Sequence, residues 1–256
     1  MACDAFGFPI ERDWAEIDAA GMAAIDLLMI GDLGVGLVQM MENAGRALAT
    51  LALRRFLSDA PRGKRVAVLA GAGGNGGGAM TAARRLVGWG AEITLVPSGS
   101  LDSLALATAS QLRILERMGV RPEFHPPREC DLIVDGLVGY SLNRPPRGRV
   151  VELIDWANAH SAPTLALDSP SGFDASEGRA LDSIVRASAT LTLALPKRGM
   201  TAAHLREAVG ALYLADISVP SFLYGRLAKP LKAPPFERGD IVRLLTRGAL
   251  EKECAP

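Results

Sequence analysis

The stretch VAVLAGAGGNGGGAMTAARRL, residues 66–86, decides the fold of this chain. Five apolar, strand-forming residues run into GAGGNGGG, in which every residue except Ala72 and Asn75 is glycine, and a helical pattern follows. Glycine at this density lets backbone N–H groups approach a ligand closely and adopt positive φ without steric cost. A helix that opens just after the glycines directs its positive end at the same place. The element therefore predicts a strand, a loop and a helix that together hold an anion such as phosphate.

Strand-like and helix-like segments alternate on both sides of this stretch. We expect helices over residues 13–30, 35–57, 102–118, 149–160 and 201–209. We expect further strands within residues 91–97, 131–139, 163–170, 189–196 and 211–218. The strands are short, continuous apolar runs, which are typical of a parallel sheet covered on both faces by helices.

The alternation predicts a three-layer α/β/α fold, which is Rossmann-like and doubly wound, with a mostly parallel sheet and N-terminal helices packed on it. We expect one α/β domain over residues 1–225 and a C-terminal extension over residues 226–256. The tail carries prolines and mixed charge, as expected for a segment that wraps the domain or mediates contacts.

Composition excludes several classes of protein. The formal net charge is zero, which argues against nucleic acid as a partner, because binding of the phosphate backbone needs excess lysine and arginine. The N-terminus has no apolar signal region, and the apolar run at residues 25–41 is too interrupted to cross a membrane. Three scattered cysteines without CxxC spacing indicate neither disulfides nor zinc, so we expect a reducing cytoplasm.

Three of the expected strands end in polar loops that contain glycine. These loops lie within residues 70–79, 135–145 and 168–174. In open α/β sheets, ligands bind outside the carboxyl ends of the strands, near a switch point in strand order. We therefore expect the three loops to meet at one edge of the sheet and to form the site.

Two nucleotide-binding readings fit the glycines poorly. The spacing GxGxxG is present as Gly71, Gly73 and Gly76, but a dehydrogenase also needs an acid at the end of the next strand. That strand ends in Val96, Pro97 and Ser98, so the dehydrogenase reading is weak. A P-loop is not indicated, because no Gly-Lys-Ser/Thr follows the glycines.

Each of the three loops also carries an oxygen ligand. Asn75, Asp135 and Ser171 offer one amide, one carboxylate and one hydroxyl, which suits a cation of low charge. Simpler structural roles stay open: Asn75 as a helix cap, and the other two as turn residues. Asp168 ends a strand beside the expected cleft, as a general acid or base would, or it organises the turn that follows.

Five motifs in the expected order resemble the YjeF N-terminal domain family. They are MMENAGRALA (40–49), Asn75 to Gly77, the stretch 135–145, DSPSG (168–172) and TLALPKRGM (192–200). Members of this family are NAD(P)H-hydrate epimerases, isomerases that interconvert the R and S epimers of hydrated NADH or NADPH. The resemblance covers residues 13–220 and implies a single-domain member without the fused dehydratase that many relatives carry.

The resemblance also implies roles for residues of this chain. Asn75, Asp135 and Ser171 match potassium ligands, and Asp168 and Lys197 match catalytic positions in the cleft. The residues that match substrate-binding loops are Gly74, Asn75, Gly76, Gly77, Gly78, Gly139, Tyr140, Ser141, Leu142, Asn143, Arg144, Pro145 and Asp168. NAD(P)H hydrate enters as the substrate and not as a cofactor, and the family implies a homodimer.

The chain departs from the family pattern in both substrate loops. Where relatives have Asn-Asn-Gly-Gly-Asp-Gly, this chain has Gly-Asn-Gly-Gly-Gly-Ala, so the acid is replaced by Gly78. Where relatives have Gly-Thr-Gly-Leu, it has Gly139, Tyr140, Ser141 and Leu142. These changes leave a second hypothesis open, a nucleotide-binding or scaffold protein that keeps the fold and has lost catalysis.

Overall fold

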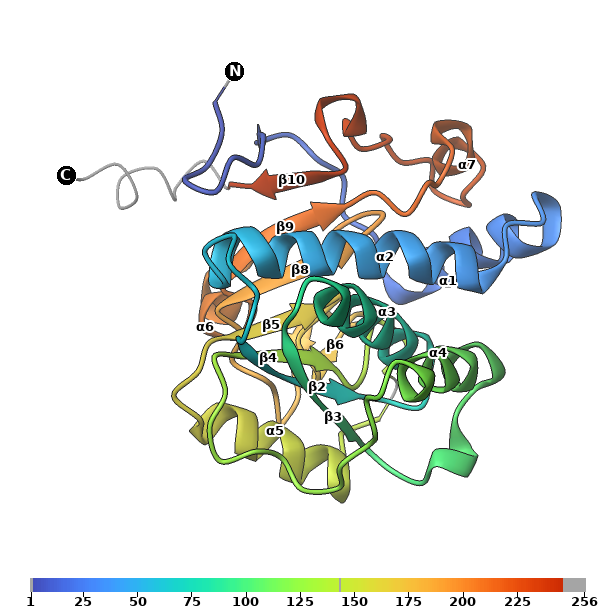
Figure 1. Ribbon diagram of the computed structural model, residues 1–256. Helices are drawn as coiled ribbons and strands as arrows, with labels where there is room; N and C mark the ends of the chain where they lie inside the picture. Colours follow the sequence, from blue (N-terminus) through green and yellow to red (C-terminus); the bar gives the residue numbers. More distant parts are fainter. Residues whose placement is uncertain (1, 143, 246–256) are drawn as a thin grey trace.

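The computed structural model describes residues 2–142 and 144–245, and in them a mostly parallel eight-stranded sheet forms the centre (Figure 1). The strand order is β1-β10-β9-β8-β5-β4-β2-β3. Its strands are β1 (Ile10–Glu11), β2 (Arg65–Ala70), β3 (Glu92–Pro97), β4 (Leu132–Gly136), β5 (Thr164–Leu167), β8 (Ala189–Leu193), β9 (Ala211–Ala215) and β10 (Ile241–Leu244). Neighbours are parallel except β9 and β10. A small antiparallel ribbon consists of β6 (Phe173–Asp174) and β7 (Arg179–Ala180).

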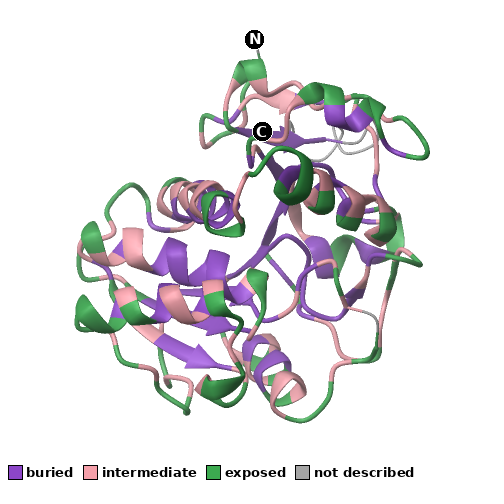
Figure 2. Ribbon diagram, turned by 90° about the vertical axis from the view of Figure 1, so that its right-hand side faces the viewer, coloured by how far each residue is buried: buried purple, intermediate pink, exposed green. Residues whose placement is uncertain are grey.

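Helices cover both faces of this sheet. They are α1 (Ala19–Leu27), α2 (Leu37–Leu51), α3 (Gly74–Gly88), α4 (Leu106–Arg117), α5 (Arg149–Ala159), α6 (Arg206–Val209) and α7 (Ser221–Gly225). The core on one face joins α2, α3 and α4 to alternate residues of β2, β4 and β5. The opposite face packs on α5, and further along the sheet on α6. Figure 2 shows this layering, with buried residues in the strands and exposed residues on the outer sides of the helices. The predicted α/β/α fold is confirmed.

Strand order explains where a ligand site forms. From β2 the chain crosses to β3 on one side and later returns to β4 on the other, so the order reverses between β2 and β4. A crevice opens at the carboxyl ends of strands at such a point. The residues of β4 and β5 are buried throughout, as the continuous apolar runs predict.

The first N-terminal helix is shorter than the predicted 13–30. Asp18 ends the extended segment before α1, because its carboxylate accepts a hydrogen bond from the Gly21 backbone N–H at 2.8 Å. Ile17, just before this cap, donates its backbone N–H to the Pro196 carbonyl at 3.0 Å. A π-helical turn (Leu28–Asp32) continues α1, and a second one (Ala52–Phe56) continues α2. The segment before α1 thus lies against the loop that carries Lys197.

The predicted glycine loop is wrong in one respect, because α3 begins at Gly74 and most of the glycines are helical. None of the glycines in residues 71–78 has a positive φ. They are needed for close packing: a Cβ on Gly76 would lie 1.9 Å from the Gly71 carbonyl oxygen, and one on Gly78 would lie 2.9 Å from Leu167. The glycine run therefore lets α3 approach the sheet and α2 closely, and it still places the helix N-terminus at the carboxyl edge.

The C-terminal segment adds a strand to the sheet. Within it, β10 pairs antiparallel with β9, and β1 from the N-terminus pairs parallel with β10. The division of the chain after residue 225 stays a prediction, and residues 241–244 beyond it lie in the same sheet. Cys254 lies outside the described residues, and Cys3 and Cys130 are free thiols. In the part of the chain that the structure describes, no helix has the length and apolar character needed to cross a membrane.

Candidate active site

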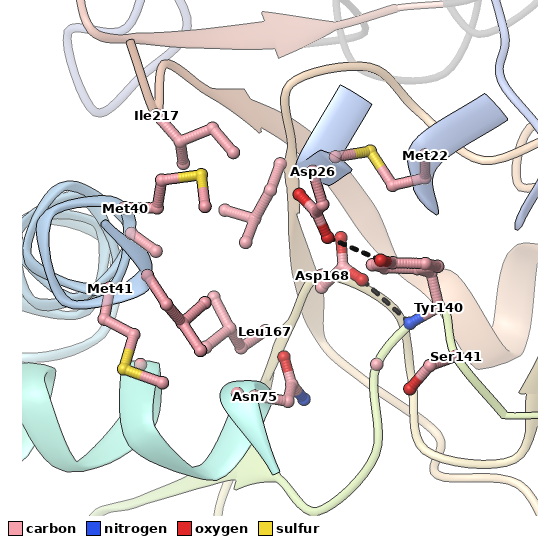
Figure 3. Close-up of a pocket in the computed structure, with 16 residues that line it drawn as sticks. Met22, Asp26, Met40, Met41, Asn75, Tyr140, Ser141, Leu167, Asp168 and Ile217 are labelled. Carbon is pink, nitrogen blue, oxygen red and sulfur yellow. Dashed lines mark hydrogen bonds between the residues drawn. The ribbon is translucent and has the colours of Figure 1, made fainter. Parts of the chain in front are cut away.

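A cavity of about 250 Å³ opens at the carboxyl edge of the sheet (Figure 3). Its walls come from α1, α2, the first turns of α3, the ends of β5 and β8, the loop after β4 and the segment after β9. The lining residues are Met22, Asp26, Leu37, Met40, Met41, Ala44, Gly74, Asn75, Gly78, Gly139, Tyr140, Ser141, Leu167, Asp168, Leu193 and Ile217. The predicted meeting of the three loops at one edge is thus confirmed in geometry. The cavity is mostly apolar, with a few polar groups at one end, as small-molecule sites usually are.

Asp168 sits on a tight turn at the end of β5. Its φ is +66°, in the left-handed region that costs a non-glycine residue about 1–2 kcal/mol. The turn is held by two backbone hydrogen bonds, from Asp168 N–H to the Leu191 carbonyl at 2.7 Å and from Ser169 N–H to the Leu167 carbonyl at 2.8 Å. Strained backbone of this kind persists where the surroundings fix it, and it is common at active sites. Here it places the carboxyl group of Asp168 on the cavity wall.

Lys197 forms a buried ion pair with Asp168. Its side chain is fully buried, the Asp168 side chain is 4% exposed, and the ammonium donates to Oδ1 of Asp168. The same ammonium donates to the Thr192 hydroxyl at 3.3 Å and to the Leu193 carbonyl at 3.0 Å. The three acceptors hold the ammonium behind the carboxyl group, and Lys197 does not itself line the cavity.

Tyr140 connects Asp168 to a second carboxyl group, which the sequence analysis did not single out. The Tyr140 backbone N–H donates to Asp168 Oδ2 at 2.9 Å, and its hydroxyl donates to Asp26 Oδ2 at 2.5 Å (Figure 3). Burial raises the pKa of Asp26, and the nearby Asp168 charge adds to the rise, while the Tyr140 hydrogen bond and Lys197 oppose it. Asp26 is the one acid within the apolar run IDLLMI, and a lone acid in such a run was the feature of the sequence that could have marked it as a site residue.

Gly139 leaves room for two polar side chains to converge. A Cβ at this position would lie 2.9 Å from Asp168 Oδ2 and 3.2 Å from Asn75 Oδ1, so a side chain here would force both groups to shift. Among the described residues, the buried amide nitrogen of Asn75 has no hydrogen-bond partner. An unpaired buried donor beside a cavity is costly, and a bound ligand can satisfy it.

Asp135 and Ser171 form a second polar cluster, which does not line the cavity. The fully buried Asp135 carboxylate accepts the Ser171 backbone N–H at 2.8 Å, the Ser171 hydroxyl at 2.6 Å and the Leu137 N–H at 3.2 Å. Burial raises the pKa of Asp135 to about 6. Among the described residues it forms no ion pair, so hydrogen bonds alone offset its negative charge. Carboxylate, hydroxyl and nearby carbonyl oxygens fit a monovalent cation, which would balance that charge.

The other predicted site residues are distributed unevenly. Gly74, Gly78 and Ser141 line the cavity, whereas Gly76 and Gly77 are buried inside the packing of α3. Of the residues predicted to bind substrate in the second loop, Leu142, Arg144 and Pro145 do not line the cavity, and Arg144 and Pro145 are exposed. Asn143 lies outside the described residues.

Comparisons with known proteins agree with this geometry. The model of the family described as "YjeF-related protein N-terminus" matches residues 37–199. The NAD(P)H-hydrate epimerase of Dehalogenimonas lykanthroporepellens is 42% identical over 226 residues, which cover 87% of this chain and 90% of that protein. The NAD(P)H-hydrate epimerase of Truepera radiovictrix is 34% identical, with coverage of 85% and 97%.

Two further matches differ in scope. The bifunctional NAD(P)H-hydrate repair enzyme Nnr of Escherichia coli is 33% identical over 77% of this chain but only 38% of its own length. The crystal structure of the yeast protein ynu0 (YNL200c) superposes with a TM-score of 0.75, at 24% identity, and covers 90% of this chain and 100% of that one. At this level of identity, the structural likeness shows that the two proteins share a fold and nothing more. The family match and the identities together show that the chain belongs to the family of proteins related to the YjeF N-terminus.

Proposed function

We propose that this protein is an NAD(P)H-hydrate epimerase, an isomerase that interconverts the R and S epimers of hydrated NADH or NADPH. Membership of the family and the two single-domain epimerases above support this activity. The observation that carries it is Asp168 on the wall of the cavity, paired with the buried Lys197 behind it. We do not favour the hypothesis of lost catalysis, because this pair and an open cavity are both present despite the changed loops.

The substrate sets the chemistry that the site has to perform. Water adds to the enamine double bond of a dihydronicotinamide with its oxygen on the carbon beside the ring nitrogen. Epimerisation requires one bond at this carbon to break and to re-form on the other face. The reaction is not a redox change, so the protein has to position the ring and move protons.

Asp168 is the group we propose for proton transfer at the hydroxylated carbon. Its carboxyl group faces the cavity on a rigid turn, and a fixed geometry of this kind favours proton transfer. Lys197 balances the charge of Asp168 from behind and fixes its orientation through Oδ1. The apolar walls formed by Met40, Met41 and Leu167 suit the flat, mostly apolar nicotinamide ring.

The N-terminus of α3 is the proposed place for the substrate's diphosphate. Helix α3, which has 15 residues, begins there, and the backbone N–H groups of its first turn are available to an anion. Gly74 and Gly78 line the cavity and have no side chains that would block the approach of a phosphate. The loop from Gly139 to Pro145 would contact the sugar, with Arg144 as a phosphate partner. These assignments rest on the family resemblance and on the position of the loops.

A potassium ion is the proposed cofactor, held by Asn75, Asp135 and Ser171. The buried negative charge of Asp135, which forms no ion pair among the described residues, supports this proposal, and Asn75 would contribute its amide oxygen, which lies near Gly139 in the same group of loops. The ion would supply positive charge beneath the cavity and fix the three loops to one another. We also propose that the protein forms a homodimer and acts in a reducing cytoplasm. The exposed apolar residues Leu27 and Val38 offer a surface for the dimer.

The activity is tested with a mixture of hydrated NADH enriched in one epimer. Purified protein in potassium buffer should bring the mixture to equilibrium faster than the spontaneous reaction, as followed by chromatographic separation of the epimers. A rate equal to the spontaneous one, with potassium and protein in excess, would contradict the proposed function.

A further inference from the structure

The cavity contains a second pair of titratable side chains, Asp26 and Tyr140, to which the proposed function assigns no role. Asp26 reaches the cavity from α1, and its Oδ2 accepts the Tyr140 hydroxyl at 2.5 Å. Asp168 reaches it from the end of β5. The two carboxyl groups come from different parts of the chain and lie beside each other at the polar end of the cavity (Figure 3).

Tyr140 links the two acids physically. Its backbone N–H donates to Asp168 Oδ2, its hydroxyl donates to Asp26, and its ring centroid lies 5.9 Å from the Lys197 ammonium. A displacement of this residue would move both contacts together. Asp26, Tyr140 and Asp168 on the cavity wall, with Lys197 behind them, thus form one connected polar set in a mostly apolar cavity.

The two carboxyl groups have different surroundings. Asp168 is paired with a buried ammonium, which compensates its negative charge. Asp26 forms no ion pair within the described residues, and burial raises its pKa, with further help from the Asp168 charge. When the surroundings of two carboxyl groups differ in this way, one is suited to give a proton and the other to accept one.

Epimerisation at a carbon beside a ring nitrogen needs both kinds of group. When the C–O bond breaks, the oxygen takes one proton and leaves as water, while the nitrogen lone pair forms a C=N⁺ bond. When water adds to the other face, a new C–O bond forms, the lone pair returns to nitrogen, and the water loses one proton. One water leaves and one enters, and the proton given by the acid is matched by the proton taken by the base.

We propose that Asp26, held by the Tyr140 hydroxyl, is a second proton-transfer group of this site and acts as the acid that complements Asp168 as the base. In the opposite direction of the reaction the two groups exchange roles. This inference rests on the proposed epimerase function, because it assigns a step within that reaction.

The contact with Asp26 needs the length of the tyrosine side chain. The family pattern described above has threonine at the position of Tyr140, and a threonine hydroxyl is attached directly to Cβ. It cannot cover the distance that the tyrosine ring spans to reach Asp26. Tyr140 in the second substrate loop thus changes how the site positions the acid Asp26, and the site itself is kept.

The test compares three variants with the wild type: Asp26→Asn, Tyr140→Phe and the control Asp32→Asn. Asp32 ends the turn after α1, is exposed and pairs with Arg226, and it does not line the cavity. The readouts are kcat, KM, the pH profile of kcat/KM, and thermal stabilisation by ADP-ribose as a measure of binding. The groups that act on Asp26 are Tyr140, Asp168 and Lys197, and all are intact in the control.

Asp26→Asn should lower kcat by about 100-fold or more, with little change in KM or in stabilisation by ADP-ribose. Activity that needs a protonated acid falls as pH rises through its pKa, so this variant should also lose the alkaline limb of the profile. Tyr140→Phe removes a hydrogen bond that lowers the pKa of Asp26, so it should move that limb to higher pH. Asp32→Asn should behave as the wild type.

Three results would overturn the inference. If the wild type epimerises and Asp26→Asn keeps its kcat, Asp26 transfers no proton and the proposed function stands without it. If Asp26→Asn loses ADP-ribose binding as strongly as turnover, Asp26 shapes the cavity only. If the wild type itself shows no epimerisation, the proposed function fails and the inference fails with it.

Discussion

Removal of the Lys197 ammonium should destabilise the fold strongly. The pair with Asp168 is almost fully buried, since the two side chains are 0% and 4% exposed. Breaking a buried pair by removing one partner typically costs about 3–5 kcal/mol, because the other charge stays buried without compensation. For a chain of this size each kcal/mol lowers Tm by about 2–4 °C, so Lys197→Met should lower it by about 6–20 °C.

A double variant separates the lost charge compensation from lost packing. Lys197→Met combined with Asp168→Asn leaves neither charge of this pair, and it should recover a large part of the lost free energy of unfolding. The exposed pair of Arg226 with Asp32 is the matched control, and Arg226→Met should cost about 0–1 kcal/mol. Thermal and urea unfolding followed by circular dichroism measure all three. The reasoning is refuted if Lys197→Met costs no more than Arg226→Met, or if the double variant is less stable than Lys197→Met alone.

Two further predictions concern packing and the cation. Gly76→Ala should destabilise the protein by about 1–3 kcal/mol or more, because the new Cβ would lie 1.9 Å from the Gly71 carbonyl oxygen. The control Gly88→Ala lies in the same helix, its Cβ meets nothing within 4 Å, and it should stabilise the protein by about 0.4–1 kcal/mol. Equal effects of the two variants in urea unfolding would contradict this prediction. Potassium at 100 times its Kd should stabilise the protein by about 2.7 kcal/mol relative to lithium buffer, and Asp135→Asn should abolish the difference; a gain that persists in this variant in thermal-shift assays would place the ion elsewhere.

The central strands could be predicted because their signal is local. The segments that became β2, β4 and β5 are continuous apolar runs, and such runs in alternation with helices favour a covered parallel sheet. The meeting of the three loops at one edge followed from the same topology, since the carboxyl ends of parallel strands share an edge. The same reasoning placed Asp168 at that edge, where it lines the cavity, and its catalytic role stays a prediction.

Tertiary contacts decided what the sequence did not reveal. The glycines within residues 74–78 were predicted to form a loop with positive φ, but they lie in α3. At Gly76, Gly77 and Gly78 glycine is needed because close packing leaves little room for a Cβ atom, a reason that the sequence alone does not show. Strand β10 in the C-terminal segment pairs with β9, and no local sequence pattern predicts this pairing. Asp26 joins the site only because α1 folds over the carboxyl edge, where Tyr140 can reach it.

The most direct test of the account is the rate at which one epimer of hydrated NADH equilibrates with the wild type and with Asp168→Asn, measured side by side in potassium buffer. The account predicts that the wild type exceeds the spontaneous rate and that Asp168→Asn lowers kcat by about 100-fold or more while it still binds ADP-ribose. Equal rates for the two proteins, both above the spontaneous rate, would contradict the central claim that the cavity at Asp168 carries the reaction.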